Sequence, residues 1–274
     1  MDTFSSNITK WYIQNGRKNL PWRKVITPYR IWISEIMLQQ TQVKTVIPFY
    51  KKFIKKYPNL KSISLATEDD ILALWTGLGF YRRAKNIYRT KEIIKKEYKN
   101  KFPSKYEELI SLPGIGRSTA GAIMSIAYKE SYPILDANVK RVISRYKKIN
   151  THEKGVVKTL WSLSKNLTPE KNIFEYTQGI MDLGATICNI RSPNCLNCPI
   201  NKTCKSAFKN FEIEYKARKE RPKKKIFFTL AHSKKSFLLF KKNEKSFWES
   251  LWIPYDGEDF KQANILKEPA KRKI

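Results

Sequence analysis

The stretch Leu112-Pro-Gly-Ile-Gly-Arg-Ser-Thr-Ala-Gly121 decides the fold of this chain. Helical patterns cover residues 104–112 before it and 117–128 after it, and Ser104 with Glu107 matches a capping box. The proline and glycines between the two patterns cannot continue a helix comfortably and favour a tight turn. The stretch therefore predicts a helix–hairpin–helix.

The turn also predicts an anion site. Gly114 and Gly116 allow the backbone to approach another surface, and the N–H groups that follow, from Arg117 onward, lack partners within a helix. Two interpretations remain open at this point. The hairpin grips a nucleic-acid phosphate, or it is an ordinary connection in an all-α protein.

The charge favours the first interpretation. The chain has 274 residues, with 54 Lys and Arg against 24 Asp and Glu, and a formal net charge of +30. Such an excess is typical of proteins that bind nucleic acids. A genome rich in A and T also inflates lysine usage, so charge alone does not decide.

No run of 18 apolar residues suits a membrane span, and residues 1–16 lack the apolar core of a signal peptide. We therefore expect a cytoplasmic protein, acting at the nucleoid as a monomer, with no membrane partner. Helical patterns recur until about residue 210 and predict an all-α core over 1–20, 28–46, 48–56, 67–75, 82–98, 104–112, 117–128, 138–148, 153–165 and 172–186. Two short strands are expected over 226–231 and 236–240.

All four cysteines lie within 17 residues, at the spacing C-x6-C-x2-C-x5-C. In a chain without an export signal this clustering favours a metal over disulfides. Four thiolates in one compact loop suit an iron–sulfur cube, whereas zinc more often takes two C-x2-C pairs. Zinc and free or disulfide-bonded cysteines remain alternatives. The candidate ligands are Cys188, Cys195, Cys198 and Cys204.

The hairpin, the aspartate at 136 and the cysteine spacing together resemble the endonuclease III superfamily of DNA base-excision glycosylases. Ser34–Val43 (SEIMLQQTQV) and Ile134–Arg141 (ILDANVKR) are similar to its MutY branch, the adenine DNA glycosylases. The resemblance covers residues 8–208. It implies an all-α helix–hairpin–helix glycosylase core with one structural 4Fe–4S cluster.

The resemblance also implies a domain organisation. Residues 1–22 and 134–208 are expected to form the iron–sulfur cluster domain, and residues 23–133 a six-helix barrel that carries the hairpin. A basic linker (209–225) and a partial, small α+β Nudix-like domain (226–274) follow. Residues 247–254 resemble the start of a Nudix domain, but no Glu-rich catalytic box is present, so no pyrophosphohydrolase activity is expected.

Two carboxylates are the candidate catalytic groups. Glu35 shares a helix face with apolar residues, so its pKa should rise, which suits a general acid; the alternative is a solvent-facing glutamate. Asp136 precedes a helix whose N–H groups it can cap, and these donors favour its ionised form. The resemblance makes Glu35 the residue that protonates the adenine ring and Asp136 the anion that stabilises the oxocarbenium ion, with Asn138 holding the sugar.

Ser118 indicates a subclass. Bifunctional members of the superfamily have a lysine at this hairpin position, which attacks the sugar as an amine. A serine hydroxyl cannot form an imine, so we expect a monofunctional glycosylase. Lys140 is near in sequence and would trap an abasic product only weakly.

An adenine within a duplex must be flipped out before it is cut. The resemblance assigns the wedge and the contact with the opposite base to Gln39, Gln40 and Thr41. It assigns stacking beside 8-oxoguanine to Phe80, where the family generally has tyrosine. Trp22, Arg23, Leu38 and Asp182 match positions that line the adenine pocket, and Asp182 is expected to accept from the exocyclic amine.

The sequence thus predicts excision of adenine mispaired with 8-oxoguanine or guanine in double-stranded DNA. A pyrimidine or thymine-mismatch glycosylase of the endonuclease III type is the first alternative. A non-catalytic iron–sulfur module that binds DNA is the second, and it would have no use for Glu35 beside Asp136.

Overall fold

The computed structural model describes residues 3–209, 228, 230, 238–242 and 251–254. The chain divides into two compact units, residues 1–215 and 216–274. The regular elements described in the first unit are all helical, as predicted. They are α1 (Thr3–Asn15), α2 (Pro21–Lys24), α3 (Pro28–Leu38), α4 (Val43–Lys56), α5 (Leu60–Ile63), α6 (Glu68–Trp75), α7 (Arg82–Glu97), α8 (Tyr106–Ser111), α9 (Arg117–Ile123), the π-helix η1 (Met124–Tyr128), α10 (Ala137–Lys147), α11 (Val156–Leu167), α12 (Ile173–Asp182), the π-helix η2 (Leu183–Ile187) and the 3-10 turn η3 (Asn201–Thr203).

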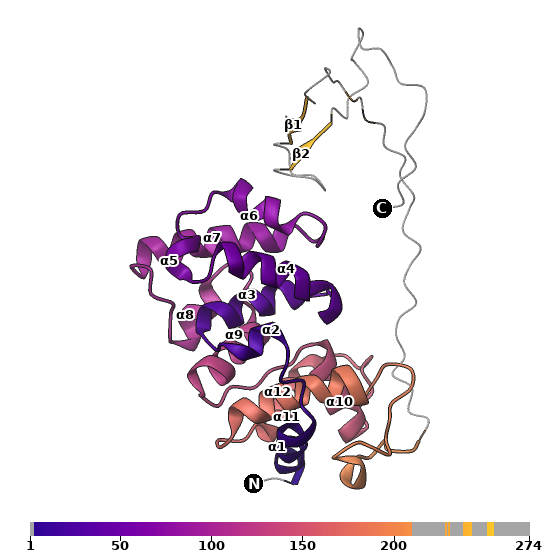
Figure 1. Ribbon diagram of the computed structural model, residues 1–274. Helices are drawn as coiled ribbons and strands as arrows, with labels where there is room; N and C mark the ends of the chain where they lie inside the picture. Colours follow the sequence, from indigo (N-terminus) through magenta and orange to yellow (C-terminus); the bar gives the residue numbers. More distant parts are fainter. Residues whose placement is uncertain (1–2, 210–227, 229, 231–237, 243–250, 255–274) are drawn as a thin grey trace. The chain divides into compact units, whose positions relative to one another are not determined.

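The helices of this unit form two groups (Figure 1). α3 is central to the first group and packs against α4, α7, α9 and η1. In the second group α1 packs along α12, near α10 and α11. The contact between α1 and α12 needs a glycine, because a Cβ on Gly179 would lie 2.9 Å from Ile8 Cγ2.

Local sequence signals explain several helix starts, with one exception. The Thr27 hydroxyl accepts a hydrogen bond from the Arg30 N–H (3.2 Å) at the start of α3, so the predicted start is confirmed. The capping box predicted from Ser104 and Glu107 is wrong. α8 begins after Lys105, which makes no side-chain capping bond.

The prediction of one helix over residues 28–46 is also wrong. α3 ends at Leu38 and α4 begins at Val43. Between them Gln40 takes a left-handed backbone conformation (φ 56°) that no helix interior contains. α4 then runs through Pro48, which lies inside the helix.

In the second unit, β1 (Phe240–Lys241) pairs antiparallel with β2 (Trp252–Ile253). Of the predicted strand over 236–240, residues 238–240 are described and only Phe240 among them is strand. Of the predicted strand over 226–231, only Phe228 and Leu230 are described, and these two are not strand. The expected linker lies almost entirely outside the described residues. Within the part of the chain that the structure describes, no helix is long and apolar enough to cross a bilayer.

Candidate active site and cysteine cluster

Glu35 lies on α3, flanked by the buried residues Ser34 and Ile36. Part of its side chain remains accessible, but burial is the main cause that raises its pKa to about 7. The negative charge of Asp136 raises the pKa further, whereas the Arg23 guanidinium lowers it. The fold therefore brings together the two carboxylates that the sequence singled out, although 101 positions separate 35 from 136 in the chain.

Asp136 is the N-cap of α10, as predicted. Its Oδ1 accepts hydrogen bonds from the N–H groups of Asn138 (2.7 Å) and Val139 (2.8 Å). These bonds lower the pKa of Asp136, and so does Arg141, but burial outweighs them and the net shift is upward. The cap donors thus favour the ionised form, as expected, but burial opposes them.

Asp182 is fully buried at the end of α12, where it joins two arginines. Arg17 donates to it from the backbone N–H (2.9 Å), Nε (2.8 Å) and Nη2 (2.6 Å). Arg23 donates from Nη1 (2.7 Å) and Nη2 (2.9 Å). Burial raises the pKa of Asp182, but these donors outweigh it and the net shift is downward. Five donors already occupy both oxygens, so the geometry favours a role in holding Arg23 beside Glu35 over the expected contact with an exocyclic amine.

The other two residues expected in the adenine pocket are Trp22 and Leu38, which differ in exposure. Trp22 on α2 is buried, with its ring edge-to-face on Tyr50 at 5.4 Å between centroids. Leu38 ends α3 and is partly exposed. Trp22 is thus largely a packing residue in this conformation, whereas Leu38 retains an accessible surface.

The hairpin turn is held by α7 and by Gln39, which follows α3. Gly114 has φ +81°, and a Cβ there would lie 2.8 Å from Asn86 Nδ2 on α7. The Gly114 carbonyl accepts from Gln39 Nε2 (3.3 Å), and the neighbouring Pro113 carbonyl accepts from the Thr90 hydroxyl (3.0 Å). The hairpin turn and the expected wedge residue Gln39 are therefore directly hydrogen-bonded to each other.

Ser118 lies in the first turn of α9 and is bonded to a different segment from the one that Gly114 contacts. Its hydroxyl accepts a hydrogen bond from the Leu135 N–H (3.0 Å), next to Asp136. The serine thus links the hairpin to the loop that carries the candidate catalytic aspartate. Lys140 also lies in this region, where its N–H donates to the Asp136 carbonyl (2.8 Å).

Gly116 and Arg117 begin α9 and are exposed. The Arg117 guanidinium lies 4.2 Å from the centre of the Trp161 ring, which holds a cation at the start of this helix. Gln40 and Phe80 are exposed as well, Phe80 to 56%. These accessible groups are the ones for which the sequence predicted DNA contacts.

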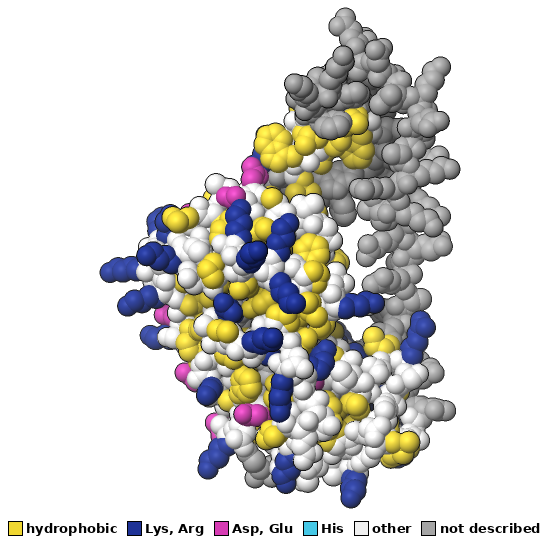
Figure 2. Space-filling model, viewed as in Figure 1, with side chains coloured by type: hydrophobic (Ala, Val, Ile, Leu, Met, Phe, Trp, Pro, Cys, Tyr) yellow, Lys and Arg dark blue, Asp and Glu magenta, His cyan; other side chains and the backbone are white. Residues whose placement is uncertain are grey.

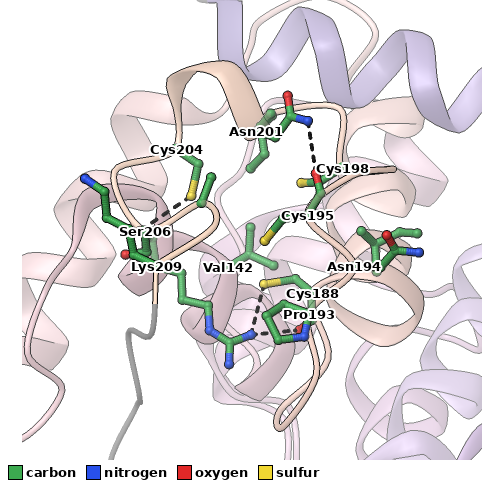
Figure 3. Close-up of a pocket in the computed structure, with 14 residues that line it drawn as sticks. Val142, Cys188, Pro193, Asn194, Cys195, Cys198, Asn201, Cys204, Ser206 and Lys209 are labelled. Atoms are coloured by element: carbon green, nitrogen blue, oxygen red, sulfur yellow. Dashed lines mark hydrogen bonds between the residues drawn. The ribbon is translucent and has the colours of Figure 1, made fainter.

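The four cysteines line one pocket (Figure 3) and none is in a disulfide. Burial and the proximity of the other three thiols raise the pKa of Cys198 to about 12. Among the described residues, no three Cys, His, Asp or Glu side chains converge closely enough to hold a single metal ion.

Two arginines of α10 were not singled out by the sequence analysis. Arg145 donates to Cys188 Sγ (3.4 Å) and to the Ile190 carbonyl (2.7 Å). Arg141 donates from Nε to the Cys188 carbonyl (2.8 Å) and from Nη2 to Asn138 Oδ1 (2.8 Å). Their spacing of four on one helix face, toward the cysteine loop, was the available signal.

The central part of the chain, residues 33–166, matches the sequence model of the HhH-GPD superfamily base excision DNA repair proteins. An adenine DNA glycosylase of Buchnera aphidicola subsp. Schizaphis graminum (strain Sg) is 47% identical over 271 residues, which is 97% of this chain and 78% of the relative. The chain belongs to the adenine DNA glycosylase family. This confirms the resemblance to the MutY branch.

Another adenine DNA glycosylase, from Buchnera aphidicola subsp. Acyrthosiphon pisum (strain APS), is 46% identical to this chain over 271 residues. The aligned region spans 97% of this chain and 77% of the relative. Among solved structures, a thermostable thymine-DNA glycosylase has a TM-score of 0.67 at 30% identity, over 74% of this chain and 94% of that one. The adenine DNA glycosylase family and this structural likeness confirm the helical helix–hairpin–helix fold.

Proposed function

We propose that this chain excises adenine mispaired with 8-oxoguanine or guanine in double-stranded DNA, and that Glu35 and Asp136 carry the reaction. The single observation that supports this most is their shared site. A glutamate with a pKa of about 7 lies within electrostatic reach of a capped, partly buried aspartate. Such a pair provides one neutral acid and one anion at neutral pH.

Protonated Glu35 gives its proton to a ring nitrogen of adenine, and the electron pair of the breaking glycosidic bond moves to the base. Asp136 stabilises the positive charge that develops on the sugar. Water then adds to the sugar carbon and its proton returns to Glu35. The hydroxyl of Ser118 is already bonded to the Leu135 N–H and cannot form an imine, so the product is an intact abasic strand.

The exposed groups of the hairpin would hold the DNA backbone, and Gln39 to Thr41 with Phe80 would meet the lesion and its opposite base. Figure 2 shows many more Lys and Arg than Asp and Glu side chains on the visible face of the helical unit. This surface suits the phosphate backbone of a duplex.

One 4Fe–4S cluster fits the cysteine pocket. Cys188, Cys195, Cys198 and Cys204 supply four soft thiolate ligands, and Arg145 already donates to one of the sulfurs. When bound, the cluster would hold residues 188–204 in one loop and take no part in cutting the base. About four irons per chain, with loss of iron in Cys198→Ser, is the expected metal analysis; stoichiometric zinc would refute the assignment.

The function is tested with single-turnover assays on duplexes that carry adenine opposite 8-oxoguanine, guanine, cytosine or thymine, followed by alkali to reveal abasic sites. We expect excision with the wild type, loss of excision with Glu35→Gln and normal excision with Glu97→Gln, a matched change at an exposed glutamate. Strand breaks without alkali would contradict the monofunctional assignment. Excision of thymine opposite guanine, with adenine left intact, would favour the activity named for the structural relative.

A further inference from the structure

Arg83, on α7, is a buried cation whose described acceptors are all neutral. Only 6% of its surface is exposed. Its guanidinium donates to four carbonyls and one hydroxyl: from Nη1 to the carbonyls of Ile36 (3.1 Å), Met37 (2.6 Å) and Gln39 (2.6 Å), and from Nη2 to the Gly79 carbonyl (3.1 Å) and Thr41 Oγ1 (3.1 Å).

Two features compensate this buried charge. Two of the acceptors, the Ile36 and Met37 carbonyls, lie in the last turn of α3, and a third belongs to Gln39, its C-cap; together they lie at the negative end of the helix dipole. The guanidinium also lies 5.3 Å from the ring centres of Trp75 and Phe80, where aromatic faces attract a cation. Burial lowers the pKa of Arg83 only to about 10, so the group stays charged at neutral pH.

The acceptors flank two strained residues. Gln40 (φ 56°) and Phe80 (φ 50°) both have left-handed backbones without being glycine, and such conformations persist only where their surroundings fix them. Arg83 bonds the residues on either side of Gln40. It also bonds the Gly79 carbonyl just before Phe80, and its own N–H donates to the Phe80 carbonyl (2.9 Å). One side chain therefore fixes both segments.

We infer that Arg83 is a positioning residue for reading the base opposite the adenine. It holds Gln40 and Phe80 in the backbone conformations that present their side chains outward, and it fixes the spacing between them. The inference rests on the proposed function, in which these two segments meet the lesion. Arg83 itself is buried and need not touch DNA.

The test compares the wild type with Arg83→Lys, which keeps the charge but cannot reach both segments at once. Arg89→Gln, at an exposed arginine of the same helix, is the control for loss of positive charge. Single-turnover excision is measured for adenine opposite 8-oxoguanine and opposite an abasic-site analogue, which offers no base to read. The ratio of the two rates measures reading of the opposite base, and a smaller folded fraction leaves this ratio unchanged.

We expect Arg83→Lys to lower this ratio about 10-fold, since one charge-assisted hydrogen bond corresponds to about that factor, and Arg89→Gln to leave it unchanged. The pH profile, which Glu35 sets, should stay the same. An unchanged ratio with a lower melting temperature would overturn the inference, since Arg83 would then only stabilise the fold.

If Arg83→Lys loses the helical circular dichroism of the wild type, Thr41→Val carries the test. It removes one acceptor of Arg83 and keeps the shape, so a ratio about threefold lower is expected and an unchanged ratio overturns the inference. Absence of adenine excision by the wild type would instead refute the proposed function, so the two failures are distinguishable.

Discussion

At the scale of single residues, the pKa of Glu35 links the structure to a measurable pH dependence. Its value of about 7 comes from burial, from the negative charge of Asp136 and, in the opposite direction, from Arg23. If protonated Glu35 is the acid, the excision rate should fall as pH rises through about 7. Asp136→Asn removes one of the two causes that raise this pKa.

The first prediction concerns Asp136→Asn. Single-turnover rates should drop by about 100-fold or more, because the anion beside the sugar is lost, and the falling limb of the remaining activity should move to lower pH. Rates from pH 5 to 9 on adenine opposite 8-oxoguanine measure both effects. A limb that stays at the same pH would show that Asp136 does not act on Glu35.

The second prediction concerns stability. The folded pKa of Glu35 lies above its ordinary value, so between about 4.5 and 7 the folded state holds a proton that the unfolded state has released. The free energy of unfolding therefore falls as pH rises through this window. Glu35→Gln removes this pH-dependent loss of stability. The variant should therefore have a higher melting temperature than the wild type at pH 8, and the difference in melting temperature should shrink by pH 5. An equal difference in melting temperature at both pH values would contradict this prediction. Glu97→Gln serves as the control.

At the scale of elements, the hairpin glycine offers the third prediction. Gly114→Ala meets both a left-handed backbone (φ +81°) and the Asn86 side chain on α7. Gly155 has the same φ, but a Cβ there meets nothing within 4 Å. Gly155→Ala should cost about 1 kcal/mol of unfolding free energy, and Gly114→Ala more, together with weaker DNA binding. Equal costs in urea unfolding would mean that the α7 contact is unimportant.

Element by element, the sequence predicted what local signals encode. The apolar spacing indicated most of the helices, Thr27 indicated where α3 begins, and Asp136 indicated the cap of α10. The break after Leu38 was not predictable in this way, because the carbonyls of Met37 and Gln39 on either side of it are held by Arg83, which lies more than 40 positions away.

The residues of the candidate site also differ in how far local sequence predicts their surroundings. Glu35 carried its own signal, since its apolar neighbours lie on the same helix. The surroundings of Asp182 did not, because its partners Arg17 and Arg23 lie 165 and 159 positions away. Long-range pairing of this kind gives Asp182 internal partners, and its expected contact with the exocyclic amine stays a prediction.

At the scale of the whole molecule, charge should dominate DNA affinity. With a net charge of +30, binding to an undamaged duplex should weaken steeply with salt, with a slope of log K against log salt more negative than about −4. Arg117→Gln, at the start of α9, should reduce that slope by about 1. Fluorescence anisotropy across a salt series measures it, and a flat dependence would exclude the phosphate contacts.

The packing of α1 against α12 also constrains how the protein is made. The partner surface of residues 3–15 is residues 173–182, so α1 is synthesised well before the helix that covers it. At about 5–20 residues per second this delay is on the order of 10–30 s. During that interval Phe4, Ile8 and Tyr12, which are buried in the finished protein, have no α12 to cover them. We therefore expect the nascent α1 segment to be a client for a chaperone that binds apolar helices.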